Sequence, residues 1–579
     1  MRSVEGNIDS AAQASQPSSR LTFAACVGLL SCLLASLVWS FPPDVNEAHY
    51  LLKARHFWDN SFCAADLFAQ SGEAHWLYYL THGWLFQFFE FPTVAWIGRI
   101  VGWMVLASGL LLLFRVFEKR WHFATFLAAA AVVTNEWFQL AGEWFVGGTE
   151  GKGLAYGFIF AGLACWFTQK RPLALMFLGF ACAFHVVVGL WSCIAFSLAA
   201  AMVWRHQAGS VKYSIQFWAL GSLGFFAGLA TGVLPGLALT AGVESETVLQ
   251  AARLQSLDRL AHHQFAAQFT RWHRFLPIVT LWIVLVSANR SLVKTESVRV
   301  GGAIRFLNAF TFAACLISVA GIGCSYLATA NVGWIADLAT RLLTLYMFRL
   351  ADVFVPVALV INLHLLIQRM PDHLDIKTIW AASCYLLVSW AILLNGLQNF
   401  KDPRSPSAVQ AEDQTTTDAN RKRALEYERN WIRVCHWIRD NTPPDAVFLT
   451  PTRNQTFKWY AHRSEFFSWK DMPQDVASVI QWAERRQAFY VHGFQSNDTT
   501  ASSTNLQWPF PATWAMEIGP LYLGDRLAAR AKQHDIDYLL VPKLHLDWVL
   551  KNYEFSSQLK QVYPIAENRN STFVLYAIR

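Results

Sequence analysis

A short polar stretch at residues 42–50 carries two carboxylates three residues apart, Asp44 and Glu47. It follows directly after a membrane-length apolar run, residues 21–41, so we expect the carboxylates where a helix leaves the bilayer. A carboxylate at that depth can meet a lipid head group and a water-soluble partner together, and it can take a proton from an acceptor hydroxyl as a general base. The same spacing after two prolines is also that of a helix capping box, which is the competing interpretation.

A glycine-rich stretch at residues 142–153 is the second place where residue types indicate a ligand. Its glycines let backbone amides approach a ligand closely, and it leads into the N-terminus of a membrane helix, which favours anions. Lys152 is predicted to neutralise a phosphate there, and Glu143 or Glu150 to contact a sugar or a metal. It is not a Walker-type phosphate loop, because a glycine follows Lys152. A flexible surface turn with solvated charges is the alternative.

The stretch at residues 241–274 is rich in basic residues and histidines, including Arg259, His262 and His263. Such a concentration of positive charge suggests a partner with negative charge, such as a phospholipid or a polyprenyl phosphate, and a plain solvated helix face is the alternative. Adjacent histidines point to different faces of a helix, so they are a weak metal signal. Arg349 and Asp352 are three residues apart at the start of an apolar run, where they can pair on one helix face or line a wet cavity.

Composition places these residues in a membrane protein. The chain has 579 residues, of which 54% are hydrophobic and only 15% charged, and 26 are tryptophan. The net charge of +7 is mild and scattered, which argues against a nucleic-acid partner, and the tryptophans fit the two membrane interfaces. Ten cysteines without a paired spacing predict unpaired thiols, although a bridge between Cys63 and Cys435 stays open.

About eleven apolar runs predict the transmembrane helices that position the candidate residues. The first, residues 21–41, is too long for the apolar core of a signal peptide and lacks a cleavage site, so we expect it to remain as a span. The others are predicted at residues 92–117, 122–140, 154–168, 172–187, 189–204, 214–240, 275–288, 305–330, 346–366 and 378–397.

Basic loops predict the orientation. One set of loops carries Lys119, Arg120, Lys170, Arg171, Arg205, Lys212, the residues 290–305, Arg369 and Lys377. By the positive-inside rule that side faces the cytoplasm. The loops at 42–91, 141–153, 241–274 and 331–345 and the C-terminal region are then external. We therefore expect a multi-pass protein of the cell inner membrane with a cytoplasmic N-terminus.

The chain divides into four predicted parts. Residues 1–20 are polar and predicted to be disordered, 21–397 form the transmembrane domain, and 398–423 are a polar linker. Residues 424–579 predict a small external α/β domain. In that domain we expect helices at 424–440, 474–491 and 518–533, strands at 446–450, 538–541, 561–565 and 572–577, and a loop rich in Ser, Thr and Asn up to about residue 510.

The candidate stretches resemble a family of membrane enzymes. Asn46-Glu47-Ala48-His49-Tyr50 followed by Lys53-Ala54-Arg55 resembles the Asp-Glu-x-x-Tyr…Ala-Arg signature of polyprenyl-phosphate-dependent glycosyltransferases. These are enzymes of the multispanning C-type (GT-C) fold, of the protein mannosyltransferase and aminoarabinose transferase kind. Residues 73–79 and 95–99 are similar to their juxtamembrane helix and second span. A bacterial multispanning branch without an assigned activity resembles more of the chain, with shared patterns at residues 47–50, 142–144, 259–263 and 437–443.

The resemblance implies a GT-C-like transmembrane domain and an inverting transfer of a sugar from a polyprenyl phosphate to an envelope glycan, lipid or protein. It implies a loop carboxylate as base, yet Asn46 stands where the family's catalytic Asp is expected, and an amide cannot act as a base. Either Asp44 or Glu47 takes that role, or the chain is a catalytically silent relative. The alternative function is non-catalytic binding or translocation of a lipid-linked glycan, or envelope assembly.

The predicted site therefore combines the loops. Its catalytic candidates are Asp44 and Glu47, and its substrate-binding candidates are Asn46, His49, Tyr50, Glu143, Glu150, Lys152, Arg259, His262, His263 and Arg349. The expected partners are a polyprenyl-phosphate-linked sugar and membrane lipids, with no nucleic acid. No cofactor is expected, and a divalent metal is left open.

Overall fold

The structure is a computed structural model of the full chain. It describes residues 16–203, 213–292, 298–330, 332–371, 375–411, 418–489, 525–543, 557–564 and 572–579. Predictions for residues 1–15, for the basic residues Arg205 and Lys212, and for the loop between residues 490 and 510 lie outside these ranges. Within the described ranges a helix begins at Gln16, so the predicted disordered segment ends earlier than residue 20.

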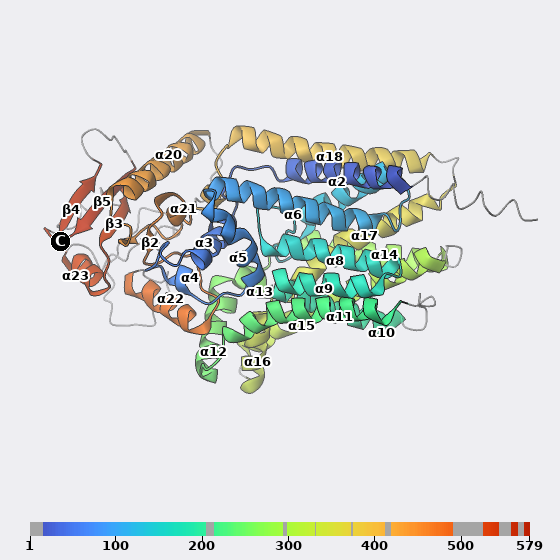
Figure 1. The fold of residues 1–579 in the computed structure, drawn as a ribbon, viewed down its shortest axis with the longest axis horizontal. Coiled ribbons are helices and arrows are strands. Elements are labelled where there is room, and N and C mark those ends of the chain that lie inside the picture. The colour runs from blue at the N-terminus through green and yellow to red at the C-terminus, as the bar shows by residue number, and fades with distance from the viewer. Residues whose placement is uncertain are drawn as a thin grey trace, which may run out of the picture.

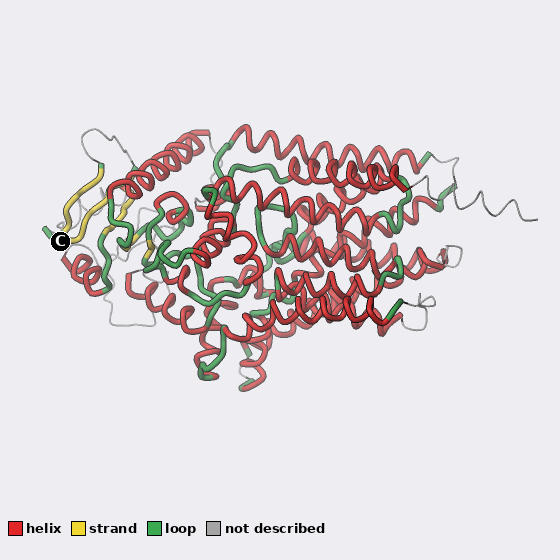
Figure 2. The backbone as a smooth tube through the Cα atoms, in the orientation of Figure 1, coloured by secondary structure: helices red, strands yellow, loops and turns green. Residues whose placement is uncertain are grey.

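Long helices lie alongside one another and make up most of the molecule (Figures 1 and 2). They are α2 (Gln16–Leu37), α6 (Phe91–Phe114), α7 (Trp121–Phe138), α8 (Gly151–Phe167), α9 (Arg171–Phe184), α10 (Val186–Val203), α11 (Ile215–Ala238), α14 (Trp272–Leu292), α15 (Val298–Thr329), α17 (Arg349–Gln368) and α18 (Ile376–Lys401). Each predicted apolar run coincides with one of these helices. Seven helices within the described residues are long and apolar enough to cross a membrane, as in an α-helical multi-pass membrane protein. The larger predicted number of crossings stays a prediction.

Small residues let neighbouring helices of the bundle approach closely. A Cβ at Gly109 of α6 would lie 2.1 Å from the carbonyl oxygen of Gly157 in α8, and one at Gly228 of α11 would lie 2.3 Å from that of Gly179 in α9. Close backbone approach at glycine is typical of helix packing in membranes, where apolar burial gives little preference for helix over lipid contact. Among the seven membrane-length helices of the described residues, α17 is the most buried.

Short helices cover one end of the bundle. The first loop contains α3 (Glu47–Trp58), α4 (Leu67–Gln70), α5 (Trp76–Gly83) and η1 (Trp84–Gln87). Later loops add α12 (Ser245–Arg253), the π-helical turn η3 (Leu254–Arg259), α13 (Ala261–Gln264), η4 (Ala266–Gln268) and α16 (Trp334–Leu343). In Figure 1 the helices α3 to α5 lie between the bundle and the C-terminal sheet, so the first loop contacts both.

The C-terminal region is a small α/β unit. It contains α19 (Pro406–Ala411), α20 (Asp418–Asn441), β1 (Val447–Leu449), α21 (Phe457–Ala461), β2 (Ser464–Glu465), α22 (Val476–Phe489), α23 (Asp525–Gln533), β3 (Tyr538–Pro542), β4 (Leu559–Tyr563) and β5 (Phe573–Ile578). The strand order is β2-β1-β3-β5-β4, with parallel pairs around β1 and antiparallel pairs around β5. The prediction missed α21 and β2, because both are too short to give a periodic pattern.

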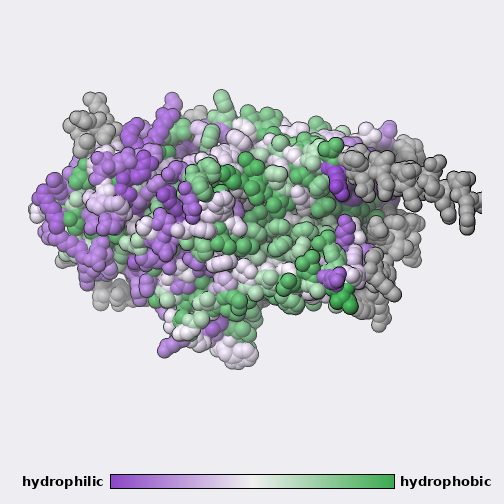
Figure 3. All heavy atoms as spheres, in the orientation of Figure 1, coloured by the Kyte–Doolittle hydropathy of each residue, from purple (hydrophilic) through white to green (hydrophobic). Residues whose placement is uncertain are grey.

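The polarity of the surface differs between the helical bundle and the C-terminal unit. Hydrophobic residues cover the visible face of the helical bundle, and hydrophilic residues gather over the C-terminal unit (Figure 3).

All ten cysteines are free, which confirms the predicted unpaired thiols and excludes a bridge between Cys63 and Cys435.

Candidate functional site

A buried ion pair joins the first loop to α6. Glu47, the first residue of α3, accepts hydrogen bonds from the Nε and Nη2 atoms of Arg99 at 2.6 and 2.7 Å. The Glu47 and Arg99 side chains are 0% and 1% exposed. Two parallel bonds between guanidinium and carboxylate are the strongest form of such a pair. Since both charges are removed from water, each depends on the other for compensation.

Backbone amides use the remaining acceptor capacity of Glu47. Its Oε1 accepts from the Thr149 amide at 2.8 Å, and its Oε2 accepts from the Asp44 amide at 2.8 Å. The second bond has the three-residue spacing of the predicted capping box, but α3 begins at Glu47, and its N-cap residue Asn46 makes no side-chain capping bond. Glu47 is therefore a neutralised anchor that joins the first loop, the glycine-rich loop and α6.

Asp44 has a different environment from its neighbour Glu47. One of its carboxylate oxygens accepts only a short-range bond from the Val45 amide, at 2.6 Å, and no basic side chain in the described part of the chain pairs with it. Burial and the nearby Glu47 carboxylate raise the pKa of Asp44 to about 6. The glycine-rich loop packs against Asp44, because a Cβ at Gly148 would lie 2.6 Å from the Asp44 Cβ. Asp44 is thus a carboxyl group that titrates close to neutral pH beside a backbone loop.

The glycine-rich loop brings three predicted residues together. Lys152 Nζ lies 3.3 Å from Glu150 and 3.8 Å from Glu143, and it sits 3.9 Å from the centre of the Trp144 ring. Asn46 donates to Glu150 at 3.1 Å, which links this group to the first loop. The charges here are buried and paired, so the alternative of a solvated surface turn is wrong.

The predicted pair of Arg349 with Asp352 is also wrong. Asp352 is 0% exposed and accepts from the amides of Leu140, Ala141 and Glu143, so it holds the start of the glycine-rich loop. These amides supply the hydrogen bonds that the buried carboxylate needs, and Arg349 is paired with other groups.

Arg349 contacts two groups from other helices. Its Nε lies 3.5 Å from Glu143, and its Nη1 lies 3.0 Å from His185 Nε2. The His185 ring lies 4.7 Å from the ring of His75, which in turn lies 3.4 Å from the Tyr50 hydroxyl. A row of polar side chains therefore runs from α17 through the α9–α10 junction to α3, with a ring contact between the two imidazoles.

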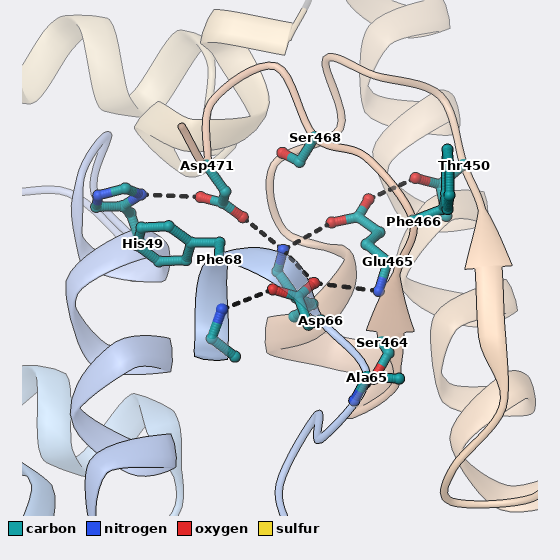
Figure 4. Close-up of polar contacts among 12 residues, drawn as sticks. His49, Ala65, Asp66, Phe68, Thr450, Ser464, Glu465, Phe466, Ser468 and Asp471 are labelled. Carbon is teal, nitrogen blue, oxygen red and sulfur yellow. Dashed lines mark hydrogen bonds and ion pairs between the residues drawn. The ribbon is translucent and has the colours of Figure 1, made fainter. Parts of the chain in front are cut away.

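A second polar cluster fixes the C-terminal unit on the first loop (Figure 4). The Lys458 ammonium of α21 lies 2.7 Å from Asp471, 2.9 Å from Asp66 and 3.2 Å from Glu465. The second oxygen of Asp471 lies 2.9 Å from His49 Nδ1, on α3. Asp66 also accepts from the Ala69 amide as the N-cap of α4. Residues from two distant parts of the sequence thus meet in one buried cluster.

The cluster holds three carboxylates around one ammonium. Burial raises the pKa of Glu465 to about 7, although Lys458 opposes this. Burial acts in the same direction on Asp471, but Lys458 and His49 hold the pKa of Asp471 well below its usual range. Burial lowers the pKa of His49, so its ring is neutral near pH 7 despite its contact with Asp471. The described residues include no group of His, Cys, Asp and Glu arranged to hold a metal ion.

The long loop contributes Arg259, His262 and His263. Arg259 ends η3 and donates from Nε to the Trp469 carbonyl at 2.6 Å, so it contacts the C-terminal unit. His263 Nδ1 lies 2.6 Å from the Ala141 carbonyl and supports the glycine-rich loop. His262 is exposed beside it, with the two rings 4.1 Å apart.

Several buried residues of the candidate site were not predicted from the sequence. Arg99, Asp66, Lys458 and Asp471 gave no local signal for their pairing, although a lysine between Phe457 and Trp459 is an unusual charge in an apolar run. Glu136, near the end of α7, has a buried Oε1 atom without a hydrogen-bond partner in the described structure, and it lies within electrostatic range of Asp44 and Lys152. A carboxylate near the end of an apolar helix was the available signal for this residue.

Comparison with known proteins gives one match in the C-terminal unit. Residues 429–489 match a family described as a domain of unknown function, DUF6798. The matched segment runs from α20 through α22, so it contains Lys458, Glu465 and Asp471. No curated protein matches the chain.

Proposed function

We propose that the protein is a membrane glycosyltransferase that transfers a sugar from a polyprenyl-phosphate donor to an envelope acceptor on the external membrane face. The observation that carries this proposal is the contrast between two neighbouring carboxylates. Arg99 neutralises Glu47, whereas Asp44 has no basic partner among the described residues and a pKa of about 6. A base whose pKa lies just below the working pH is deprotonated and still accepts a proton effectively.

The reaction is an inverting substitution at the anomeric carbon of the donor sugar. The acceptor hydroxyl oxygen forms the new bond to that carbon as the bond to the phosphate oxygen breaks. The hydroxyl proton passes to Asp44, and the polyprenyl phosphate leaves with the bonding electron pair. Cations of the external loops stabilise the charge on the leaving phosphate.

The proposal also includes the number of membrane crossings, the GT-C-like fold of the bundle and its orientation in the membrane. The turns α6–α7, α8–α9 and α17–α18 lie at the end of the bundle away from the C-terminal unit (Figure 1), and they carry Lys119, Lys170 and Arg369. With that end in the cytoplasm, a GT-C-like domain of eleven crossings in the inner membrane puts the site and the C-terminal domain outside.

Sugar transfer from radiolabelled polyprenyl-phosphate sugars by the purified protein tests the proposal. We expect turnover in the wild type, its loss in Asp44→Asn, and its retention in Glu90→Gln, a variant of a first-loop carboxylate that is 72% exposed. Turnover that persists in Asp44→Asn would exclude Asp44 as the base.

A second candidate function is binding or translocation of a lipid-linked glycan without turnover. It is favoured by Asn46, which stands at the expected position of a catalytic acid and uses its amide to bind Glu150. Binding of donor lipids by a wild type that turns over none of them would support this function.

A further inference from the structure

Two cations lie next to each other where the long loop meets the C-terminal unit. Arg259 is 7% exposed, and its guanidinium carbon lies 5.1 Å from the centre of the Trp469 ring. Lys470 follows Trp469 directly in the chain and is half-buried. Trp469 is held at both ends, since its amide donates to Thr452 at 3.0 Å and its carbonyl accepts from Arg259. The backbone at Lys470 is therefore fixed beside Arg259.

Within the described structure neither cation has a carboxylate partner. The acidic residues that surround them are already paired: Asp258 lies 2.7 Å from Arg486, Glu150 lies 3.3 Å from Lys152, and Asp471 is shared by Lys458 and His49. Lys470 makes no hydrogen bond or ion pair with any described residue, and Arg259 makes only the bond from Nε and the ring contact. Two adjacent positive charges, one of them on a side chain that is only 7% exposed, therefore lie together without a carboxylate at ion-pair distance, an arrangement that favours an anion between them.

The electrostatics of the neighbouring groups agree with this geometry. Burial and the charge of Arg259 lower the pKa of Lys470 to about 8. Partial burial and the charges of Arg259 and Lys470 lower the pKa of His262 to about 4, although part of the ring remains exposed. His262 is thus a neutral, exposed imidazole that can donate a hydrogen bond beside the two cations. Arg259 also sits in a π-helical turn, a feature that is frequent at functional sites.

We propose that Arg259, Lys470 and His262 form a binding site for a phosphoryl group, which the C-terminal unit completes through Lys470. Arginine offers a planar fork of donors to phosphate oxygens and lysine a compact charge, a combination suited to a phosphoryl group. Lys152 and Arg349 are weaker candidates for this role, because Glu150 and Glu143 already neutralise them. The choice of a phosphoryl group over another anion rests on the proposed function, whereas the cationic site itself does not.

Calorimetric titration of the purified full chain tests the site with three probes: inorganic phosphate, geranyl phosphate and the uncharged alcohol geraniol. We expect the wild type to bind geranyl phosphate and not geraniol, and we expect binding to weaken as salt is added. If inorganic phosphate binds as tightly as geranyl phosphate, the site recognises the phosphoryl group alone. If only geranyl phosphate binds, the ligand is a lipid phosphate.

Lys470→Gln should weaken the binding of geranyl phosphate about tenfold or more, since it removes a charge from a hydrogen-bonded anion site. Lys470→Arg should keep most of the affinity because it keeps the charge, and Lys560→Gln on the exposed face of β4 should leave it unchanged. Lys470→Gln is the primary variant because this side chain makes no hydrogen bond or ion pair with a described residue, and thermal unfolding checks its fold. Equal affinity in Lys470→Gln and the wild type, or no binding of either phosphate by the wild type, would overturn the inference.

The outcomes separate this inference from the proposed function. Phosphate binding that depends on Lys470, in a protein that transfers no sugar, would support the anion site and reject the transferase. Sugar transfer by Lys470→Gln with an unchanged KM for the donor would reject the anion site and leave the transferase intact.

Discussion

At the residue scale, Glu47 and Arg99 are expected to contribute to stability rather than to proton transfer. Glu47→Gln removes the charge that compensates a guanidinium only 1% exposed, so the free energy of unfolding should fall by about 3–5 kcal/mol. Thermal unfolding in detergent measures this, with Glu90→Gln as the control, because the exposed Glu90 lies 3.6 Å from Arg55 and its loss should cost under about 1 kcal/mol. Equal melting temperatures for the two variants would show that the buried pair is not a structural anchor.

Neutralising Asp44 should increase the stability measured by thermal unfolding, whereas neutralising Glu47 should decrease it. Its pKa is 3.8 in the unfolded chain and about 6 in the folded protein, so the folded state binds more protons between these values. The contribution of Asp44 to stability therefore falls as the pH rises through this window. Asp44→Asn should raise the free energy of unfolding at pH 8 by about 1–2 kcal/mol, with little change below pH 4. A destabilised Asp44→Asn protein at pH 8 would contradict the raised pKa.

The pH dependence of the rate tests the same group in its proposed role. A base must be deprotonated to act, so kcat/KM for sugar transfer should rise with pH through about 6 and level off above it. Asp44→Glu is the matched variant, because it keeps the carboxyl group and should shift the midpoint rather than abolish the rise. A profile that is flat between pH 5 and pH 7 would assign the proton transfer to another group. Stability and activity then make opposite demands on Asp44, as is common at active sites.

At the element scale, Lys458 connects α21 and β2 to α3 and α4. Lys458→Met leaves three buried carboxylates without their cation, so we expect a loss of about 3–5 kcal/mol and earlier cleavage by protease between the bundle and the C-terminal unit. Lys532→Gln on the exposed face of α23 removes the same charge elsewhere and should change neither measurement. Unchanged protease sensitivity in Lys458→Met would mean that the cluster does not hold the two parts together.

Glu465 gives this cluster a pH dependence with a defined sign. Its pKa is 4.5 in the unfolded chain and about 7 in the folded protein, so its contribution to stability falls as the pH rises from 4.5 to 7. Glu465→Gln resembles the protonated form and should remove this slope while leaving stability below pH 4.5 unchanged. Thermal unfolding of both proteins across this range measures the difference, and parallel curves would exclude Glu465 as its source.

The sequence predicts those helices and contacts that are determined by residues close together in the chain. An apolar run long enough for a membrane helix is visible in the residues themselves, and each such prediction coincides with a helix. The spacing of Asp44 and Glu47 likewise predicted the bond between the Asp44 amide and Glu47. The contact of Lys458 with Asp66 joins residues 392 positions apart, and neither α21 nor α4 is long enough to give a pattern. Contacts between residues far apart in the sequence, and helices of a single turn, leave no pattern in the local sequence. Most contacts of the site could therefore not be predicted from the sequence.

At the scale of the whole molecule, apolar and charged residues separate along the long axis. Figure 3 shows hydrophobic residues over the bundle and hydrophilic residues over the C-terminal unit, so a polar domain lies at one end of the bundle. The opposite end carries the basic turns, such as Lys119 and Arg120 between α6 and α7. An excess of lysine and arginine in the short loops at one end of a helical bundle sets its orientation during insertion. The site at the C-terminal end would then face the outside of the cell.

An impermeant maleimide tests this orientation with two single substitutions at exposed lysines, Lys119→Cys in the α6–α7 turn and Lys560→Cys on β4. In right-side-out membrane vesicles we expect labelling of Lys560→Cys and protection of Lys119→Cys, with the reverse in inside-out vesicles. The wild type controls for its ten native thiols, most of which are buried or lie within the apolar helices. Labelling of both positions from the same side would require the chain to cross the membrane an even number of times between them. If both positions were labelled only in inside-out vesicles, the C-terminal unit would lie on the cytoplasmic side, and Asp44 beside it would have to act on a substrate presented from the cytoplasm.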